Sequence, residues 1–194
     1  MLKYIFIGSP LPLQYNMKRG VIVGVVAVVI ASTGLFAFLL APKGPPIREF
    51  TIDMVEHVFI QGQEYNPTLR VKVGDTVVIK LTNRGVVAHH FMIIEDVETV
   101  IAVLRGVLRE LHASGAPDEV IVEHYKHKLH ELEASDSIRV AFGVHVDLEP
   151  GASDSISFTA TRPGVFTYVC LIADGTYPDT HYDKGMYGTI IVEP

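Results

Sequence analysis

The sequence predicts an all-β sandwich that carries an inserted helical hairpin and follows an N-terminal transmembrane helix. Three observations lead to this prediction. From Ile47 onward, short segments of alternating apolar and polar residues are separated by turn residues, a pattern typical of sandwiches and barrels rather than of parallel βαβ units. The segment at about 97–134 instead has apolar residues at helical spacing. Near the N-terminus lies a long apolar stretch without charge.

The apolar stretch runs from Val21 to Ala41, 21 residues without a charged side chain. At a helical rise it is long enough to cross a hydrocarbon core about 30 Å thick. Lys18 and Arg19 precede it, and this charge bias places the N-terminus inside and the remainder outside the cytoplasm. We therefore expect residues 1–20 to be cytoplasmic and 21–41 to be a single-pass anchor in the cell membrane. A cleaved signal peptide is the alternative, although its apolar part usually has only about 7–15 residues.

The prolines and glycine within 42–47 are expected to form a short linker, and 48–194 a single domain. Met17, followed directly by two basic residues, is an alternative start to Met1. All 22 acidic residues but only 12 of the 16 basic residues follow position 47, so this part has a formal charge of −10. Such an excess argues against nucleic acid as a partner.

Several strands and one hairpin are expected in the domain. The segments 69–73 and 77–81 flank the turn signal Gly74-Asp75 and are expected to pair as a hairpin. Strict alternation over 138–146 predicts a strand that points His145 away from the core. Further strands are expected at 156–160, at 165–170, which ends on Cys170, and at 188–192.

The inserted segment is expected to form two helices, separated near Gly115 and Pro117. The apolar residues that recur at helical spacing are Val97, Ile101, Leu104, Leu108 and Leu111 in the first helix and Ile121, Tyr125, Leu129 and Leu132 in the second. These stripes should pack on each other and on the sandwich. His124, His127 and His130 lie three apart on the second helix, where a solvated polar face is the favoured interpretation and a second metal site the alternative.

Four residues that can bind a soft metal lie at or after predicted strands: His89, Cys170, His181 and Met186. Two imidazoles, one thiolate and a weak thioether suit copper that cycles between two oxidation states. Zinc would also bind, but it has no redox chemistry and does not need a methionine. Cys170 is the single cysteine, which excludes an intramolecular disulfide and a cysteine-based zinc or iron–sulfur cluster. The alternative is that Cys170 and Met186 are core residues and the histidines lie on the surface.

Two segments resemble the cupredoxin family of blue copper proteins. They are NPTLRVKVGDTVVIKLTNRGVVAHHF at 66–91, and PGVFTYVC at 163–170 followed by His181 and then GMYGTIIVE at 185–193. The resemblance implies a Greek-key β-sandwich that binds one type 1 copper ion. His89, Cys170 and His181 would bind it in a plane and Met186 axially.

Two departures from the family pattern concern the surroundings of these ligands. Ten residues separate Cys170 from His181, more than in plastocyanins or azurins and nearer to copper nitrite reductases and archaeal sulfocyanin-like proteins. His90 stands where the family usually has Asn or Ser. Neighbours on a strand point to opposite faces, so only one of His89 and His90 should reach the metal, and the alignment of Phe91 with the family pattern selects His89.

The resemblance implies a carrier of single electrons rather than an enzyme, working at the outer face of the cytoplasmic membrane. Its acidic surface favours redox partners with basic patches, such as a c-type cytochrome or a terminal oxidase. Tyr182 and Tyr187 flank the ligand loop and either line an electron-transfer surface or pack in the sandwich. One alternative is a subunit of a copper oxidase or nitrite-reductase-like enzyme, which would need a second copper centre. Another is a non-catalytic copper-binding surface protein.

Overall fold

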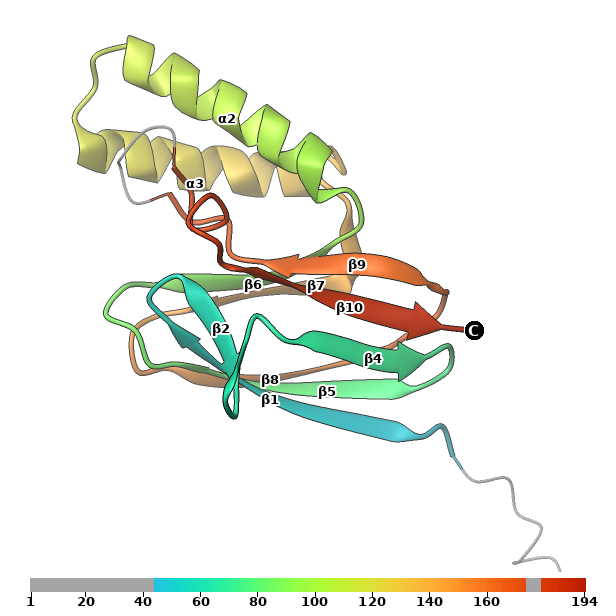
Figure 1. The fold of residues 1–194 in the computed structure, drawn as a ribbon. Coiled ribbons are helices and arrows are strands. Elements are labelled where there is room, and N and C mark those ends of the chain that lie inside the picture. Colours follow the sequence, from blue (N-terminus) through green and yellow to red (C-terminus); the bar gives the residue numbers. More distant parts are fainter. Residues whose placement is uncertain (1–43, 174–178) are drawn as a thin grey trace, which may run out of the picture. The chain divides into compact units, whose positions relative to one another are not determined.

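A computed structural model describes residues 44–173 and 179–194, which form two five-stranded sheets and two helices (Figure 1). The expected anchor at 21–41, the linker up to residue 43 and the alternative starts lie outside the described residues. Within the described part, no helix has the length and apolar character needed to cross a bilayer. The anchor therefore stays a prediction.

The elements follow one another along the chain and divide between two sheets and a helical layer. The first sheet has the order β3-β2-β1-β5-β8, and the second β4-β10-β9-β6-β7. The strands of the first sheet are β1 (Ile47–Val55), β2 (Val58–Gln61), β3 (Glu64–Tyr65), β5 (Thr76–Asn83) and β8 (Ser153–Thr159). Those of the second are β4 (Thr68–Lys72), β6 (His89–Ile94), β7 (Val140–Leu148), β9 (Gly164–Val169) and β10 (Tyr187–Glu193). The helices are α2 (Val97–Ala113) and α3 (Asp118–Ala134).

The sandwich core forms where alternate residues of both sheets face one another. In β5, for example, Val77, Ile79 and Leu81 are at most 1% exposed, whereas the residues between them are partly exposed or exposed. Phe91 of β6 stacks on Tyr168 of β9, with ring centroids 5.3 Å apart. This alternation is the expected signature of strands buried on one face, and the predicted mostly-β sandwich with two helices is confirmed.

The expected hairpin of 69–73 with 77–81 is wrong. The two strands lie in different sheets: β4 pairs in parallel with β10, whereas β5 pairs with β1 and β8. The turn at Gly74, whose φ is 91°, carries the chain across the core from one sheet to the other. Alternating residues show which face of a strand is buried but not which strand is its neighbour, so a tight turn between two such segments did not identify the pairing.

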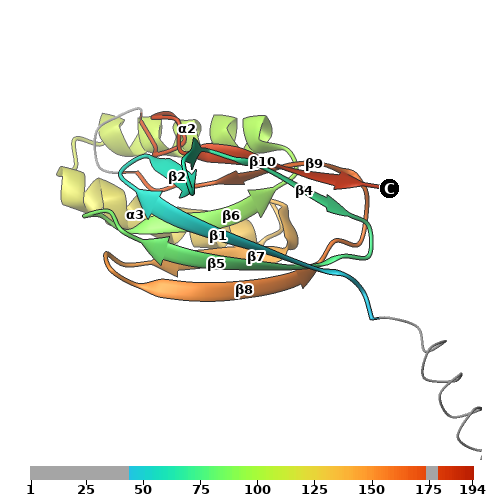
Figure 2. The same ribbon diagram turned by 60° about the horizontal axis from the view of Figure 1, so that its bottom comes forward.

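The helical hairpin covers the outer face of the second sheet (Figures 1 and 2). Its bounds, 97–113 and 118–134, match the predicted insertion. The carboxylate of Asp96 caps α2 by accepting from the backbone N–H of Thr99 at 3.2 Å, and Gly115, at φ 71°, ends it in a left-handed conformation. A second core forms beneath the helices from their predicted apolar residues and the outward residues of β6 and β9, among them Leu104, Leu108, Tyr125, Leu129, Met92, Ile94 and Val169.

A bulge interrupts the strict alternation predicted for 138–146. Phe142 and Gly143 have positive φ angles of 56° and 67°, and the register between β6 and β7 shifts at this point. Beyond the bulge, His145 faces away from the sandwich core, as predicted. The face it joins is not open to solvent, because Glu133 of α3 lies against the imidazole.

Candidate metal centre

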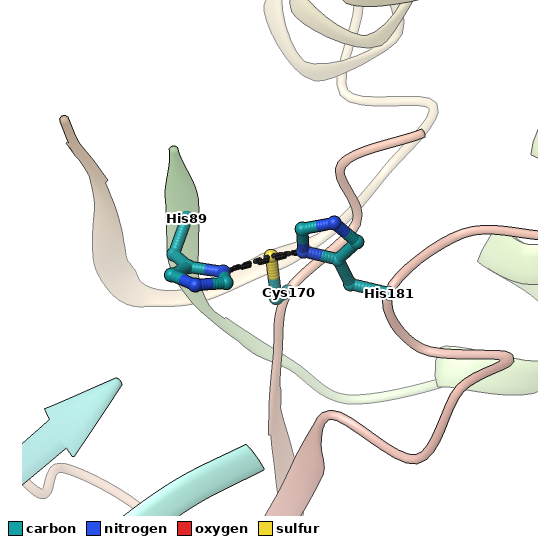
Figure 3. Close-up of side chains that lie close together, drawn as sticks. All are labelled: His89, Cys170 and His181. Atoms are coloured by element: carbon teal, nitrogen blue, oxygen red, sulfur yellow. Dashed lines mark hydrogen bonds between the residues drawn. The ribbon is translucent and has the colours of Figure 1, made fainter. Parts of the chain in front are cut away.

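Three predicted ligands come together at one end of the sandwich (Figure 3). His89 begins β6, Cys170 directly follows β9, and His181 lies in the loop between β9 and β10. The two Nδ1 atoms are 3.2 Å apart, and Cys170 Sγ lies 3.3 Å from the Nδ1 of His181 and 3.9 Å from that of His89. All three donor atoms therefore converge on one point, although His89 and Cys170 are 81 positions apart in the sequence.

The spacing of these donors fits a metal ion. A circle through three atoms separated by 3.2, 3.3 and 3.9 Å has a radius of about 2.0 Å, close to the usual bond lengths of about 2.0–2.3 Å from a first-row metal to imidazole nitrogen or thiolate sulfur. Two imidazole nitrogens and one cysteine sulfur at this spacing would hold a copper ion, and they are the donors that blue copper sites use.

Burial excludes water from the three ligands and controls their protonation. His89, Cys170 and His181 are at most 1% exposed. Burial, reinforced by the nearby His57, lowers the pKa of His89 to about 4, so its imidazole is neutral at physiological pH. Burial also raises the pKa of the Cys170 thiol to about 12, so the metal-free site holds a thiol and an incoming ion must displace its proton.

Two backbone N–H groups contact the cysteine sulfur. His90 donates its N–H to Cys170 Sγ at 3.2 Å, and the backbone N–H of Ile172 also bonds the thiol. Both bonds favour the thiolate and partly oppose the effect of burial on the Cys170 pKa. Hydrogen bonds of this kind tune the sulfur of blue copper sites.

Met186 is fully buried, and both its backbone N–H and its backbone carbonyl form hydrogen bonds with other predicted ligands. Its N–H donates to the carbonyl of His181 at 2.9 Å, and its carbonyl accepts the N–H of Cys170 at 3.1 Å. The N–H of His181 in turn donates to the carbonyl of Ile172 at 2.8 Å. These bonds hold Met186 next to Cys170 and His181 in the structure, and its thioether would be the fourth, weak ligand of a bound copper ion. The donor set is that of a type 1 copper site.

The mostly-β sandwich and this ligand set match the cupredoxin-like arrangement expected from the sequence. No protein-family model matches the chain, and no curated protein matches it. Among solved structures, a reduced auracyanin from the photosynthetic bacterium Roseiflexus castenholzii is similar at 24% identity, covering 75% of this chain and 97% of that one, with a TM-score of 0.44. Rusticyanin from Thiobacillus ferrooxidans is similar at 18% identity, covering 76% and 77%, with a TM-score of 0.47.

Two further similar structures are auracyanin A and a multicopper oxidase. Auracyanin A from Chloroflexus aurantiacus, a "blue" copper protein, has 18% identity over 76% of this chain and 99% of its own, with a TM-score of 0.43. A multicopper oxidase has 25% identity over 79% of this chain but only 44% of its own, also with a TM-score of 0.43. All four TM-scores lie below 0.5.

Two asparagines that the sequence did not single out hold the segments around the ligands. Asn83 is fully buried; its amide donates to the carbonyls of Val87 and Leu148 at 2.8 Å, and its side-chain oxygen accepts the N–H of Gly85 at 2.9 Å. It therefore fixes the turn that leads into His89. Asn66 donates to the carbonyl of Gly185, next to Met186, at 2.8 Å. These bonds hold the segments next to His89 and Met186 in place.

The helical hairpin also holds the ligand loop. Tyr125 of α3 is buried and donates its hydroxyl to the carbonyl of Leu171 at 2.7 Å, directly after the cysteine. On α2, Arg105 pairs with Asp183, and Glu98 accepts a hydrogen bond from the hydroxyl of Tyr182 at 2.9 Å. The insertion is therefore part of the support of the metal centre.

The other predicted candidates lie away from this centre. His90 points to the opposite face from His89, as the strand geometry predicted. His124 and His127 are exposed on α3, as expected for a solvated face. His130, the third of these histidines, is 43% exposed, and its ring stacks on that of His145 with centroids 5.7 Å apart. Tyr182 and Tyr187 contact each other, with centroids 4.9 Å apart. Sequence reasoning missed His57, whose partly exposed ring meets that of His181 edge-on at 4.8 Å.

Proposed function

We propose that this chain is a type 1 copper protein that transfers single electrons between redox partners at the outer face of the cytoplasmic membrane. The observation that carries the proposal is the convergence of His89, Cys170 and His181 on one buried point. Copper bound there would supply a one-electron couple. The residues of the chain hold its ligands, exclude water and give the electron a route to the surface.

A carrier needs a site whose geometry changes little between the two oxidation states, and the surroundings of these ligands support that property. His89 and Cys170 are attached to strands of the same sheet, and Cys170, His181 and Met186 are linked by backbone hydrogen bonds. Side chains held by packing and hydrogen bonds keep a fixed geometry when the charge of the metal changes.

Transfer of electrons rather than conversion of a substrate is supported by burial. The three converging ligands are at most 1% exposed, so a substrate would have to displace protein atoms in order to coordinate the metal. An electron, in contrast, needs only a short path through a protein side chain. The ring of His57 offers such a path, because it contacts His181 and also reaches solvent.

The proposed location and partners rest on the sequence. The uncharged segment Val21 to Ala41 and the preceding basic residues support a membrane anchor with the copper domain outside. A formal charge of −10 after position 47 supports a partner with a basic docking surface, such as a c-type cytochrome or a terminal oxidase. Such charge pairing speeds encounter and is weakened by salt.

The test is visible absorption of the full chain in detergent, loaded with Cu(II) and then reduced, beside a Cys170→Ser variant. We expect an intense thiolate-to-copper band that disappears on reduction and is absent from the variant. A colourless copper-loaded chain would refute the type 1 site. A coloured chain that exchanges no electrons with cytochrome c on the time scale of turnover would instead support the copper-binding surface protein.

A further inference from the structure

We propose that His90, His145 and Asp147 form a second metal site, which takes a divalent cation of the zinc class and is separate from the type 1 centre. The three residues lie on the two paired strands β6 and β7, on the face covered by α3. None of them belongs to the copper ligand set. The proposal therefore stands on its own observations and does not depend on the electron-transfer function.

The donor atoms of these residues converge as those of a metal site do. Asp147 Oδ1 lies 3.3 Å from His90 Nε2 and 2.9 Å from His145 Nε2, and all three atoms are within 4.8 Å of one another. The imidazole rings of His90 and His145 meet edge-on, with centroids 5.4 Å apart. Two imidazoles and one carboxylate are the ligands found in three-residue zinc sites, where water fills the fourth position.

A second carboxylate orients one of these imidazoles. Glu133 of α3 lies 2.7 Å from His145 Nδ1. When Nδ1–H donates to Glu133, the lone pair of His145 is on Nε2, the atom that faces Asp147. A carboxylate that holds the far nitrogen of a ligand histidine in this way is the usual support of a metal-bound imidazole.

The imidazole of His90 is also kept away from water. Its side chain is only 4% exposed, and its Nδ1 has no hydrogen-bond partner among the described residues. Its other nitrogen, Nε2, faces Asp147 and is the atom that an ion would bind. A pocket whose lining includes two of the three residues, His90 and Asp147, gives an ion a path to them. The copper ligand His89 lines the same pocket.

The chemistry of the donors selects the class of ion. Imidazole and carboxylate suit zinc and similar divalent first-row ions, whereas Cu(I) prefers sulfur ligands. The type 1 centre contains the single thiolate of the chain, so the two sites differ in the ions they favour. The copper centre can be filled first and the second site then titrated with Zn²⁺.

The experiment uses the full chain in detergent with one equivalent of copper bound. Zn²⁺ is titrated into it by calorimetry, and retained copper and zinc are counted by elemental analysis after desalting. We expect one zinc per chain beside the copper. His145→Ala is expected to lose the zinc and keep the thiolate-to-copper band, and Glu133→Gln to weaken zinc binding by about 10–100-fold. His124→Ala is the matched control. It removes an exposed histidine of α3, the helix that carries Glu133, and should bind zinc like the parent chain.

A measurement on the parent chain covers the case in which a variant fails to fold. In the reduced, diamagnetic protein, the ring ¹⁵N signals of His90 and His145 should shift together on zinc addition, with His145 fixed as the Nδ1–H tautomer. The proposal is overturned if the copper-loaded parent chain retains no zinc. It is also overturned if zinc binds without moving these two signals, or if binding is lost in His124→Ala instead of His145→Ala.

Discussion

Replacing Asn83 by alanine tests how strongly the turn before His89 is held. The change removes three hydrogen bonds, to the carbonyls of Val87 and Leu148 and from the N–H of Gly85. Because a buried backbone group that loses its partner costs about 1–3 kcal/mol, we expect the free energy of unfolding to fall by about 3–5 kcal/mol. That is a large part of the roughly 5–15 kcal/mol available to a typical domain.

The assay is guanidinium unfolding of the copper-free chain in detergent, followed by far-ultraviolet circular dichroism. Thr82→Ala is the matched control, since the hydroxyl of the neighbouring Thr82 accepts one exposed hydrogen bond, from the Ser153 hydroxyl at 3.1 Å. We expect a change in the free energy of unfolding within about 0.5 kcal/mol. A loss below about 1 kcal/mol for Asn83→Ala would refute the reasoning, because it would show that other groups replace the three bonds.

Three further predictions concern the ligands and the residues that contact them. Gly85→Ala would place a methyl group 2.9 Å from Nε2 of His89, so we expect a shifted or weakened thiolate-to-copper band, whereas Gly106→Ala, which meets nothing within 4 Å, should leave the spectrum unchanged. In the copper-free chain, burial lowers the pKa of His89 from 6.5 to about 4 and raises that of Cys170 from 9.0 to about 12. The fold favours the neutral form of both groups, so the copper-free chain should be most stable between about pH 6.5 and 9. Its free energy of unfolding should decrease as the pH falls from 6.5 toward 4 and as it rises from 9 toward 12. Denaturant midpoints that increase in either range would contradict these pKa shifts. His57→Ala should slow electron exchange with cytochrome c several-fold while leaving the band unchanged, and an unaltered stopped-flow rate would show that electrons take another route.

The affinity of the site for copper should depend on pH because of the Cys170 thiol. Because Cu(II) must displace the proton of Cys170, whose pKa is about 12 in the metal-free site, copper binding should release this proton at neutral pH. Apparent affinity should therefore rise about tenfold per pH unit between about pH 6 and 9. Equilibrium competition with a chelator of known affinity measures this slope, and an affinity independent of pH would mean that the thiol is already ionised.

The sequence by itself determined both helices, several strands and the identity of the ligands, because these follow from local patterns. Period-two alternation identified β4, β5 and β7 to β10, and helical spacing identified the insertion with its bounds at 97 and 134. It did not single out β1, β2 or β3. His89, Cys170 and His181 were recognised from residue type, order and strand context. The opposite orientation of His90 followed from strand geometry alone.

Only the tertiary structure decided which elements are neighbours, because pairing depends on contacts between residues far apart in the chain. It placed β4 and β5 in different sheets despite the short turn between them. It brought Asn83 to the carbonyl of Leu148, 65 residues away, and Tyr125 to the ligand loop. It also joined His90, His145 and Asp147 beneath α3, a cluster that no spacing along the sequence indicates, since a strand pattern fixes the face of a residue but not what lies opposite it.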